Sequence, residues 1–279
     1  MLHIGNVVPS LEILQKINEI DAFKYAWLNQ MSQNKVLKNV HYAGIYDVIK
    51  PEYEVITPKT DNKMMENLWT DPSSNFQGYK EHKNYIRLLR CIFDNYKSLA
   101  LSETLILRMH KLLFNNIIEK CGKYKNKQNS ILVYNVDSGV TYRLFEPAAP
   151  QDTPQLMQEL IAWTNENLHK GIYHPIIVIA LFADYFLAIH PFREGNGRMM
   201  RALIMLLMMQ AGYIYMPYSS LEAIIKASKS AYYRSLWLTH QTIWSDKPNY
   251  EPWLAFFVKL LEKQKLLLEE KISPLLHSL

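Results

Sequence analysis

The stretch His190-Pro-Phe-Arg-Glu-Gly-Asn-Gly-Arg-Met-Met-Arg201 combines a histidine, a carboxylate, a glycine-framed turn and two arginines within twelve residues. Gly195 and Gly197 leave little side chain over the backbone, so successive N–H groups can face an anion where the following helix begins. Arg198 and Arg201 are three residues apart, which puts both guanidinium groups on one face of a helix. Such a pair can bind the outer phosphates of a nucleotide. The stretch therefore predicts a phosphate-binding loop.

Glu194 stands directly before the glycines and would meet the phosphates as a like charge unless a divalent cation lay between them. We therefore infer Mg²⁺, bound through one carboxylate and the phosphate oxygens. A helix-capping carboxylate is the alternative role for this residue. The stretch has neither the Gly-x-x-x-x-Gly-Lys-Ser/Thr of Walker-type loops nor the Gly-x-Gly-x-x-Gly of dinucleotide folds, so it indicates another class of nucleotide site.

The stretch resembles the signature of the Fic family, His-Pro-Phe-x-Asp/Glu-Gly-Asn-Gly-Arg-x-x-Arg, and fills every specified position of it. The likeness runs from about Ser73 to the C-terminus. It also includes Gly122-Lys-Tyr-Lys125, Glu146-Pro-Ala-Ala-Pro150, Tyr232-Tyr233 and Trp253. The resemblance implies a mainly α protein with the Fic fold, a helical bundle that carries a β-hairpin flap.

The resemblance also implies an activity, the transfer of AMP from ATP to a protein. His190 would act as general base and take the proton from a Ser, Thr or Tyr hydroxyl, whose oxygen attacks the α-phosphate of ATP. An ordinary imidazole, with a pKa of about 6.5, suits this step. The implied nucleotide-binding residues are Gly195, Asn196, Gly197, Arg198, Arg201 and Tyr233, and Glu194 is the implied magnesium ligand. Tyr232 and Tyr233 could wall the adenine pocket, although aromatic residues at helical spacing more often pack in a core.

The middle of the chain predicts a β-hairpin. Ser130–Val136 and Val140–Phe145 are two β-favouring runs around the turn residues Asp137-Ser-Gly139. In Fic proteins the corresponding flap holds the target in extended form by strand addition. The resemblance then implies that Thr141, Tyr142 and Arg143 lie nearest the acceptor. A hairpin that only covers the core is the alternative.

A departure from the family occurs upstream, in Ser73-Ser-Asn-Phe-Gln-Gly78. Autoinhibited Fic proteins carry a helix of the form Ser/Thr-x-x-x-Glu-Gly/Asn, whose glutamate pairs with the second arginine of the motif. Here Gln77 stands in place of that glutamate. Its amide can hydrogen-bond Arg201 but cannot neutralise it, so the resemblance implies weakened autoinhibition and poor removal of AMP. The match of Ser73 and Gln77 could also be accidental, and Gln77 could be an engineered change.

Helical periodicity accounts for most of the remaining chain. The predicted helices are 10–33, 84–99, 102–119, 155–168, 175–189, 197–210, 221–239 and 251–273, and Gly212 is a stop for the motif helix. Residues 46–72 contain three prolines and little periodicity. We therefore expect an N-terminal helical region and connecting loop over 1–72 and a catalytic core over 73–279.

Composition favours an ordinary soluble protein: 49% of the 279 residues are hydrophobic, enough for a full core. No stretch approaches the roughly 18 uninterrupted apolar residues that a membrane helix needs, and the N-terminus lacks the pattern of a secretory signal. No membrane association and a cytoplasmic location are therefore expected, with an effector secreted by another route left open. Cys91 and Cys121 are too few for a disulfide framework. The net charge is +5, but the basic residues form no stripe interleaved with aromatic residues, which argues against nucleic-acid binding.

The expected partner is a target protein that bears a hydroxyl acceptor. The resemblance also allows a homodimer, although no residue indicates an interface. Two rival functions remain open: a transferase with another donor, such as UTP or another phosphate-containing molecule, and a nucleotide-sensing interaction module without turnover. His190 argues against the sensor, and the intact Gly195-Asn-Gly197 segment favours AMP over phosphate transfer.

Overall fold

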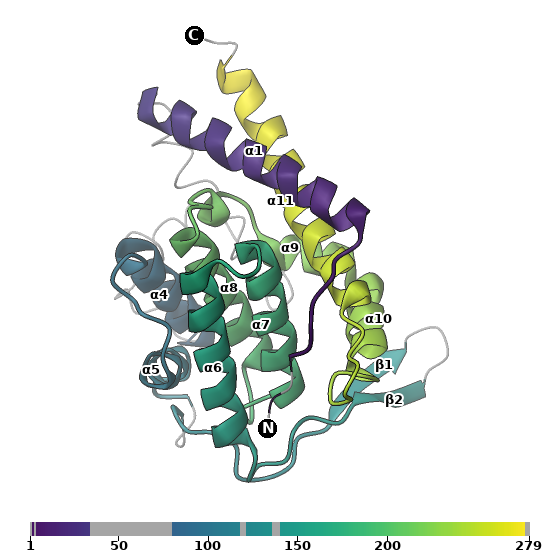
Figure 1. The fold of residues 1–279 in the computed structure, drawn as a ribbon. Coiled ribbons are helices and arrows are strands. Elements are labelled where there is room, and N and C mark those ends of the chain that lie inside the picture. Colours follow the sequence, from purple (N-terminus) through teal and green to yellow (C-terminus); the bar gives the residue numbers. More distant parts are fainter. Residues whose placement is uncertain (1, 3, 34–79, 118–120, 136–139, 277–279) are drawn as a thin grey trace.

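The computed structural model describes residues 2, 4–33, 80–117, 121–135 and 140–276, and every structural statement refers to these. Most of this part of the chain is helical, and its strands form a hairpin, so the predicted fold class is confirmed (Figure 1). The helices are α1 (Leu11–Gln33), α4 (Lys80–Asn95), α5 (Glu103–Leu113), α6 (Thr153–Lys170), α7 (Pro175–Ile189), α8 (Asn196–Gln210), α9 (Leu221–Ala227), α10 (Lys229–His240) and α11 (Glu251–Leu276), with a short 3-10 turn at Met216–Tyr218.

The α7 helix is the centre of the fold, because every residue from Ile176 to Ile189 is buried. A helix that is apolar on all sides must be covered on all sides. The neighbours that cover it are α6, α8 and α11 (Figure 1). The predicted range of this helix, 175–189, is confirmed at both ends. Since α7 runs directly into the motif, its fixed position also fixes the residue that follows it, His190.

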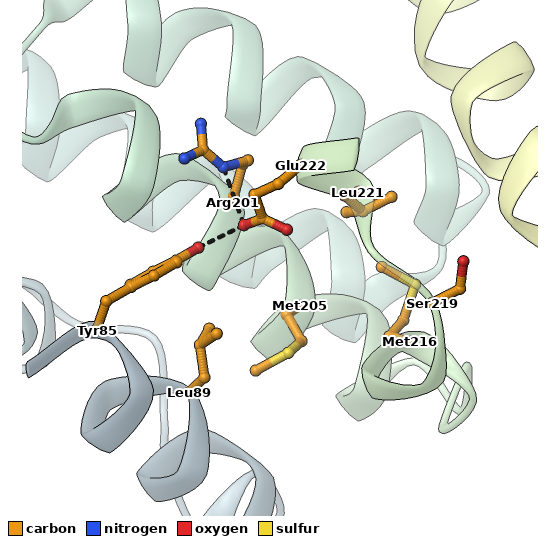
Figure 2. A pocket seen from close by; sticks show the side chains of 8 residues that line it. All are labelled: Tyr85, Leu89, Arg201, Met205, Met216, Ser219, Leu221 and Glu222. Carbon is orange, nitrogen blue, oxygen red and sulfur yellow. Dashed lines mark hydrogen bonds and ion pairs between the residues drawn. The ribbon is translucent and has the colours of Figure 1, made fainter. Parts of the chain in front are cut away.

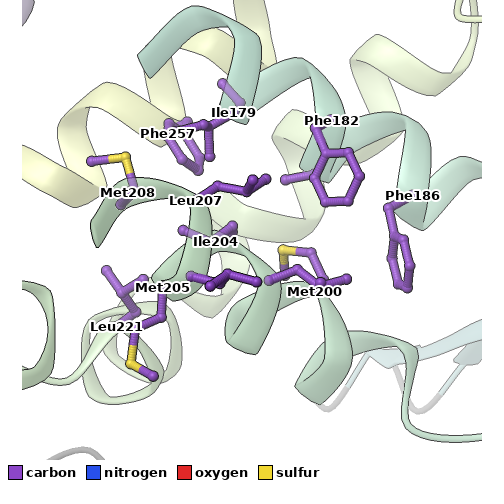
Figure 3. Packing of buried hydrophobic residues seen from close by; sticks show 14 of the residues in the cluster. Ile179, Phe182, Phe186, Met200, Ile204, Met205, Leu207, Met208, Leu221 and Phe257 are labelled. Carbon is purple, nitrogen blue, oxygen red and sulfur yellow. The ribbon is translucent and has the colours of Figure 1, made fainter. Parts of the chain in front are cut away.

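The α8 helix packs its methionines into the core beside α7. Met200, Met205 and Met208 lie among apolar side chains of α7, α9 and α11 in Figure 3. An unbranched thioether fills irregular gaps well, which accounts for so many methionines in one helix. The helix ends where predicted: Gly212 adopts a φ of 92°, and the N–H of Tyr213 donates to the carbonyl of Met208 at 2.9 Å.

The predicted hairpin is present as β1 (Ile131–Asn135) and β2 (Val140–Phe145). The strands are antiparallel, with Tyr134 opposite Thr141 and Leu132 opposite Arg143. The hairpin projects beside α10 in Figure 1 and contacts that helix through β2.

Three predicted helices differ from the structure. The helix expected over 84–99 is α4, which begins and ends four residues earlier, at Lys80 and Asn95. The single helix expected over 221–239 is divided into α9 and α10 at Ser228, whose hydroxyl donates to the carbonyl of Ile224 at 2.7 Å. A hydroxyl bonded back to the helix in this way favours a bend. The helix expected over 102–119 ends at Leu113, and Asn116 has a φ of 58°. Regular helix cannot continue through a left-handed residue.

The N-terminal α1 helix lies along α11 (Figure 1). Its buried residues Ile13, Ile17 and Trp27 belong to the same apolar cluster as α7 and α8. The boundary at residue 72 stays a prediction, since residues 34–79 lie outside the described chain. Among the described residues, no helix is both long and apolar enough to cross a membrane.

Candidate active site

The loop between α7 and α8 begins and ends with a left-handed residue. His190 has a φ of 52° and caps α7 by donating its N–H to the carbonyl of Phe186 at 2.9 Å. Gly195 has a φ of 79° and precedes the first residue of α8. A Cβ at Gly195 would lie 2.3 Å from the ring of Phe114, a distance that no real contact has. Glycine is therefore required at 195 for two reasons, the left-handed backbone and the close approach to Phe114 at the end of α5.

Asn196 closes this loop from inside. Its side-chain oxygen accepts from the N–H of Phe192 at 2.9 Å, and its amide donates to the Phe192 carbonyl at 2.7 Å. The side chain is buried, with 2% of the residue exposed. These bonds hold the loop in one shape and leave the backbone N–H groups at the start of α8 as the groups that could bind an anion. A nucleotide contact by Asn196 stays a prediction.

His190 is held as a neutral imidazole. Its Nδ1 lies 3.2 Å from the carbonyl of Leu187. Because a carbonyl can only accept, Nδ1 carries the proton and Nε2 carries the lone pair. Burial lowers the pKa of His190 to about 4, helped by the positive charges of Lys125 and His240 and opposed by the Leu187 hydrogen bond. The ordinary pKa expected from the sequence is therefore wrong for the unliganded protein, and Nε2 is available to accept a proton at neutral pH.

Lys125 supports the backbone around His190. Its N–H donates to the carbonyl of Pro191 and its ammonium donates to the carbonyl of Ile189, both at 2.8 Å. The residue is 6% exposed, and burial lowers its pKa to about 8. A charged side chain is rarely buried this far unless it is hydrogen-bonded. Lys125 thus holds the residues on both sides of the histidine.

A buried histidine–carboxyl pair lies on the flap side of His190. The Nε2 of His240 is 2.8 Å from Oδ1 of Asp184, and their side chains are 1% and 0% exposed. Burial raises the pKa of Asp184, while His240 opposes that rise. The ring of Phe145, at the end of β2, contacts His240 at 4.2 Å and His190 at 6.5 Å between centroids. The hairpin therefore ends against the candidate base.

The two arginines of the motif project from α8. Arg198 places its guanidinium carbon 5.2 Å from the centre of the Phe114 ring, a cation–π contact. Arg201 donates from Nε to Oε1 of Glu222 at 3.0 Å. A Cβ at Gly197 would lie 3.3 Å from Nη1 of Arg201, so this guanidinium reaches back to the first turn of the helix. Both positive groups therefore lie near the turn where the sequence predicts phosphate.

Glu194 is exposed in this loop, and its carboxylate makes no hydrogen bond or ion pair with another described residue. Among the described residues, no group of three or more His, Cys, Asp or Glu side chains could hold a metal by itself. One carboxylate next to an expected phosphate is the ligand set typical of Mg²⁺, which keeps waters and shares phosphate oxygens. The residues present therefore fit the predicted ion.

Part of the chain matches a known family. The sequence profile of the Fic/DOC family matches residues 100–208. Protein adenylyltransferase Fic of Drosophila melanogaster is 33% identical over 119 residues, which cover 42% of this chain and 21% of the relative. Residues 100–208 form a Fic/DOC family domain. The chain matches only about a fifth of the length of such relatives.

Solved structures agree with the Fic assignment at the level of the fold. A Fic family protein from Desulfovibrio desulfuricans G20 superimposes with a TM-score of 0.74 at 18% identity, covering 98% of this chain and 77% of that one. IbpAFic2 covalently tethered to Cdc42 superimposes with a TM-score of 0.51 at 20% identity, covering 92% and 72%. The similarity thus extends beyond the Fic domain itself into the helices on either side.

The other predicted residues fall outside the 190–201 segment. Thr141, Tyr142 and Arg143 lie in β2, opposite β1, within the Fic domain. Tyr233 lies in α10, where its ring contacts Tyr232, and Tyr232 packs against Trp253 and Phe256 of α11. Their functional roles stay predictions. Ser73 and Gln77 lie outside the described residues.

The structure adds residues to the candidate site that the sequence did not indicate. His110, on α5, stacks on Phe192 at 3.8 Å, accepts from the N–H of Gly122 and donates to the carbonyl of Glu194. Glu222, on α9, holds Arg201. The signal for His110 is a histidine on the apolar face of a predicted helix, and for Glu222 a carboxylate two residues after a serine that could begin a helix.

Proposed function

We propose that this chain is a protein adenylyltransferase, which transfers AMP from Mg-ATP to a hydroxyl of a target protein. The observation that carries the proposal is the state of His190. Its imidazole is neutral, its Nδ1 is bonded to Leu187, and it leads into a glycine turn that begins a helix with two arginines. A base next to an anion-binding turn fits attack on a phosphate ester or anhydride.

The reaction balances as a single displacement at phosphorus. The target hydroxyl gives its proton to Nε2 of His190 while its oxygen bonds to the α-phosphorus of ATP. The bond from that phosphorus to the oxygen bridging the α- and β-phosphates breaks, and pyrophosphate leaves. The pKa of about 4 in the unliganded protein suits a base that must be deprotonated before substrate binds. Nearby phosphate charge then raises this pKa and strengthens the base.

Phosphate binding is assigned to the start of α8. The backbone N–H groups of this turn, together with Arg198 and Arg201, supply positive charge for the phosphates. Mg²⁺, held by Glu194 and the phosphate oxygens, would neutralise charge on the departing pyrophosphate. Tyr233 is assigned to the adenine side of the site.

The target is assigned to an outer edge of the β1–β2 hairpin. Because Phe145 at the end of β2 contacts His190, a strand added to this hairpin would run close to the base. Strand addition uses main-chain hydrogen bonds, with Thr141, Tyr142 and Arg143 nearest the acceptor. The tethering of IbpAFic2 to Cdc42 supports a protein as the substrate class.

Regulation is assigned to Gln77, which cannot neutralise Arg201 as a glutamate would. We expect weak autoinhibition and little removal of AMP. The change Gln77→Glu should lower both ATP affinity and transfer, because a second carboxylate would compete with phosphate for the guanidinium. Equal ATP affinity in parent and variant would exclude an inhibitory role for this position.

The deciding experiment follows label from ATP into protein. The parent and His190→Ala are incubated with Mg²⁺ and α-labelled ATP, alone and with a cell lysate, and His169→Ala serves as the control because His169 is an exposed histidine on α6. Label should enter protein with the parent and the control and be absent with His190→Ala. Mass analysis of the product should show added AMP.

The rival functions give different outcomes in the same assay. Label from α-labelled UTP but not from ATP would indicate another donor, and label from the γ-position of ATP would indicate phosphate transfer. Tight ATP binding without transfer of any label, unchanged by His190→Ala, would replace the enzyme with a nucleotide-sensing module.

A further inference from the structure

Arg201 is held by a carboxylate from outside the 190–201 segment. Its Nε donates to Oε1 of Glu222 at 3.0 Å, and the same oxygen accepts from the hydroxyl of Tyr85 at 2.5 Å (Figure 2). The side chains of Arg201 and Glu222 are only 16% and 7% exposed. Charge-assisted bonds with this little solvent are stronger than a surface pair. The arginine therefore has a defined anchor at the Nε side of its guanidinium.

The anchor itself is fixed from several directions. Tyr85 comes from α4 and is 1% exposed, and Glu222 comes from the first turn of α9. The hydroxyl of Ser220 caps α9 by accepting from the N–H of Ala223 at 3.0 Å and also lies 3.4 Å from Oε2 of Glu222. Three helices thus meet at this carboxylate. A side chain bonded at both oxygens has little rotational freedom left.

The orientation of Arg201 follows from this anchor. With Nε turned to Glu222, the two terminal nitrogens point away from the carboxylate, as Figure 2 shows. One of them, Nη1, lies 3.3 Å from the place of a Cβ at Gly197, in the first turn of α8. A guanidinium is a rigid planar fork, so fixing Nε also fixes the direction of the other donors. Stability alone does not explain such a pair, because buried ion pairs contribute little net stability.

We propose that Glu222 is a positioning residue, which together with Tyr85 sets the guanidinium of Arg201 for the outer phosphates of the nucleotide. This inference rests on the proposed function, since it assumes a nucleotide with a phosphate chain. Glu222 touches no substrate and acts through Arg201. An arginine that rotates freely loses conformational entropy each time it binds a phosphate, whereas an anchored arginine has already lost it during folding.

The test compares a nucleotide that has outer phosphates with one that lacks them. Affinities of the parent, Glu222→Ala, Glu222→Gln and Arg201→Ala for ATP and for AMP are measured by calorimetry with Mg²⁺. Glu222→Ala should weaken ATP binding by roughly tenfold and AMP binding by less than about twofold, because only ATP reaches the outer site. Glu222→Gln should keep ATP binding within about threefold, since its amide oxygen still accepts from Arg201 and Tyr85.

The double variant shows whether Glu222 acts through Arg201. In the Arg201→Ala background, adding Glu222→Ala should change ATP affinity by less than about twofold, because coupled residues are non-additive. Glu262→Ala is the matched control: it breaks a pair with Lys16 at 2.6 Å between α1 and α11, away from the motif, and should leave both affinities unchanged.

Three results would overturn the inference. They are unchanged ATP affinity in Glu222→Ala, equal loss of ATP and AMP, and full additivity with Arg201→Ala. A parent that binds neither nucleotide would overturn this inference and the proposed function together. A parent that binds ATP but transfers no label would remove the proposed function alone, and the ATP-to-AMP comparison would still decide the role of Glu222.

Discussion

Two histidines belong to or contact the 190–195 loop, and burial affects them in the same way. Burial lowers the pKa of both His190, at the end of α7, and His110, on α5, to about 4. Their hydrogen bonds differ. His110 uses both ring nitrogens, with Nδ1 accepting from Gly122 at 2.9 Å and Nε2 donating to Glu194 at 3.2 Å. The ring of His190 bonds only through Nδ1 among the described residues.

The difference separates a structural imidazole from a reactive one. A lowered pKa by itself records burial and does not identify a base. His110 has no lone pair left to accept a substrate proton without breaking its bond to Gly122. His190 retains one at Nε2. His190 should therefore govern the reaction and His110 the shape of the loop, so that each variant is a control for the other.

The largest effect is expected from His190→Ala. Loss of a positioned general base typically lowers the rate by about 10²–10⁴-fold, and we expect a fall in this range in AMP transfer. The loop should stay folded, because its closure depends on Asn196 rather than on the imidazole. Initial rates with labelled ATP and thermal melting of the same samples measure the two properties. A transfer rate within tenfold of the parent would contradict the assignment of the base.

The next effect concerns the glycine that brings the loop onto α5. Gly195→Ala combines a φ of 79° with a Cβ 2.3 Å from the Phe114 ring, and we expect a destabilisation of about 2–5 kcal/mol. Gly171→Ala is the matched control, because Gly171 has a φ of 63° but no atom within 4 Å of the added Cβ. It should cost only about 1–2 kcal/mol. Equal costs in urea unfolding would show that the ring contact is unimportant.

Sequence reasoning succeeded where the determinants are contiguous. The range of α7 was predictable because a run that is apolar except for Asp184 and the hydroxyl of Tyr185 lies between His174-Pro175 and His190-Pro191. The hairpin was predictable because β-favouring runs flank a turn signal. The turn and helix start within the 190–201 segment were predictable for the same reason, since a twelve-residue pattern contains its own spacing, while the roles of its residues stay predictions. Ser228 shows the limit, because helical periodicity does not reveal that a hydroxyl will bond back to Ile224.

The contacts that the sequence did not predict join residues that are far apart in the chain. His110 reaches the carbonyl of Glu194 across 84 positions, Lys125 reaches Ile189 across 64, and Glu222 reaches Arg201 across 21 and a change of helix. No local period connects such pairs. They arise only in the folded chain, where α5 meets the 190–195 loop and α9 meets α8, so the tertiary structure was needed to find them.

A smaller effect than that of Gly195 is expected from His110→Ala. Removal of the ring leaves the N–H of Gly122 and the carbonyl of Glu194 without partners and opens space beside Phe192. We expect a loss of about 2–4 kcal/mol in the free energy of unfolding at pH 7. Transfer per folded molecule should fall far less than in His190→Ala. A fall in transfer per folded molecule as large as that in His190→Ala would make His110 part of the chemistry.

The smallest effect is the pH dependence of the stability that His110→Ala loses. Burial is the main reason that the folded protein keeps His110 neutral down to about pH 4, while the unfolded chain takes up a proton near pH 6.5. Between these values the unfolded state binds more protons, so the free energy of unfolding rises with pH. The contribution of His110 to it is fully present above about pH 6.5 and is lost as the pH falls towards 4. The His110→Ala variant lacks this term. Its deficit relative to the parent should therefore shrink by roughly 2 kcal/mol between pH 7 and pH 5. Urea unfolding at both pH values measures it, and a constant deficit would mean that His110 is protonated in the fold, contrary to its bond from Gly122.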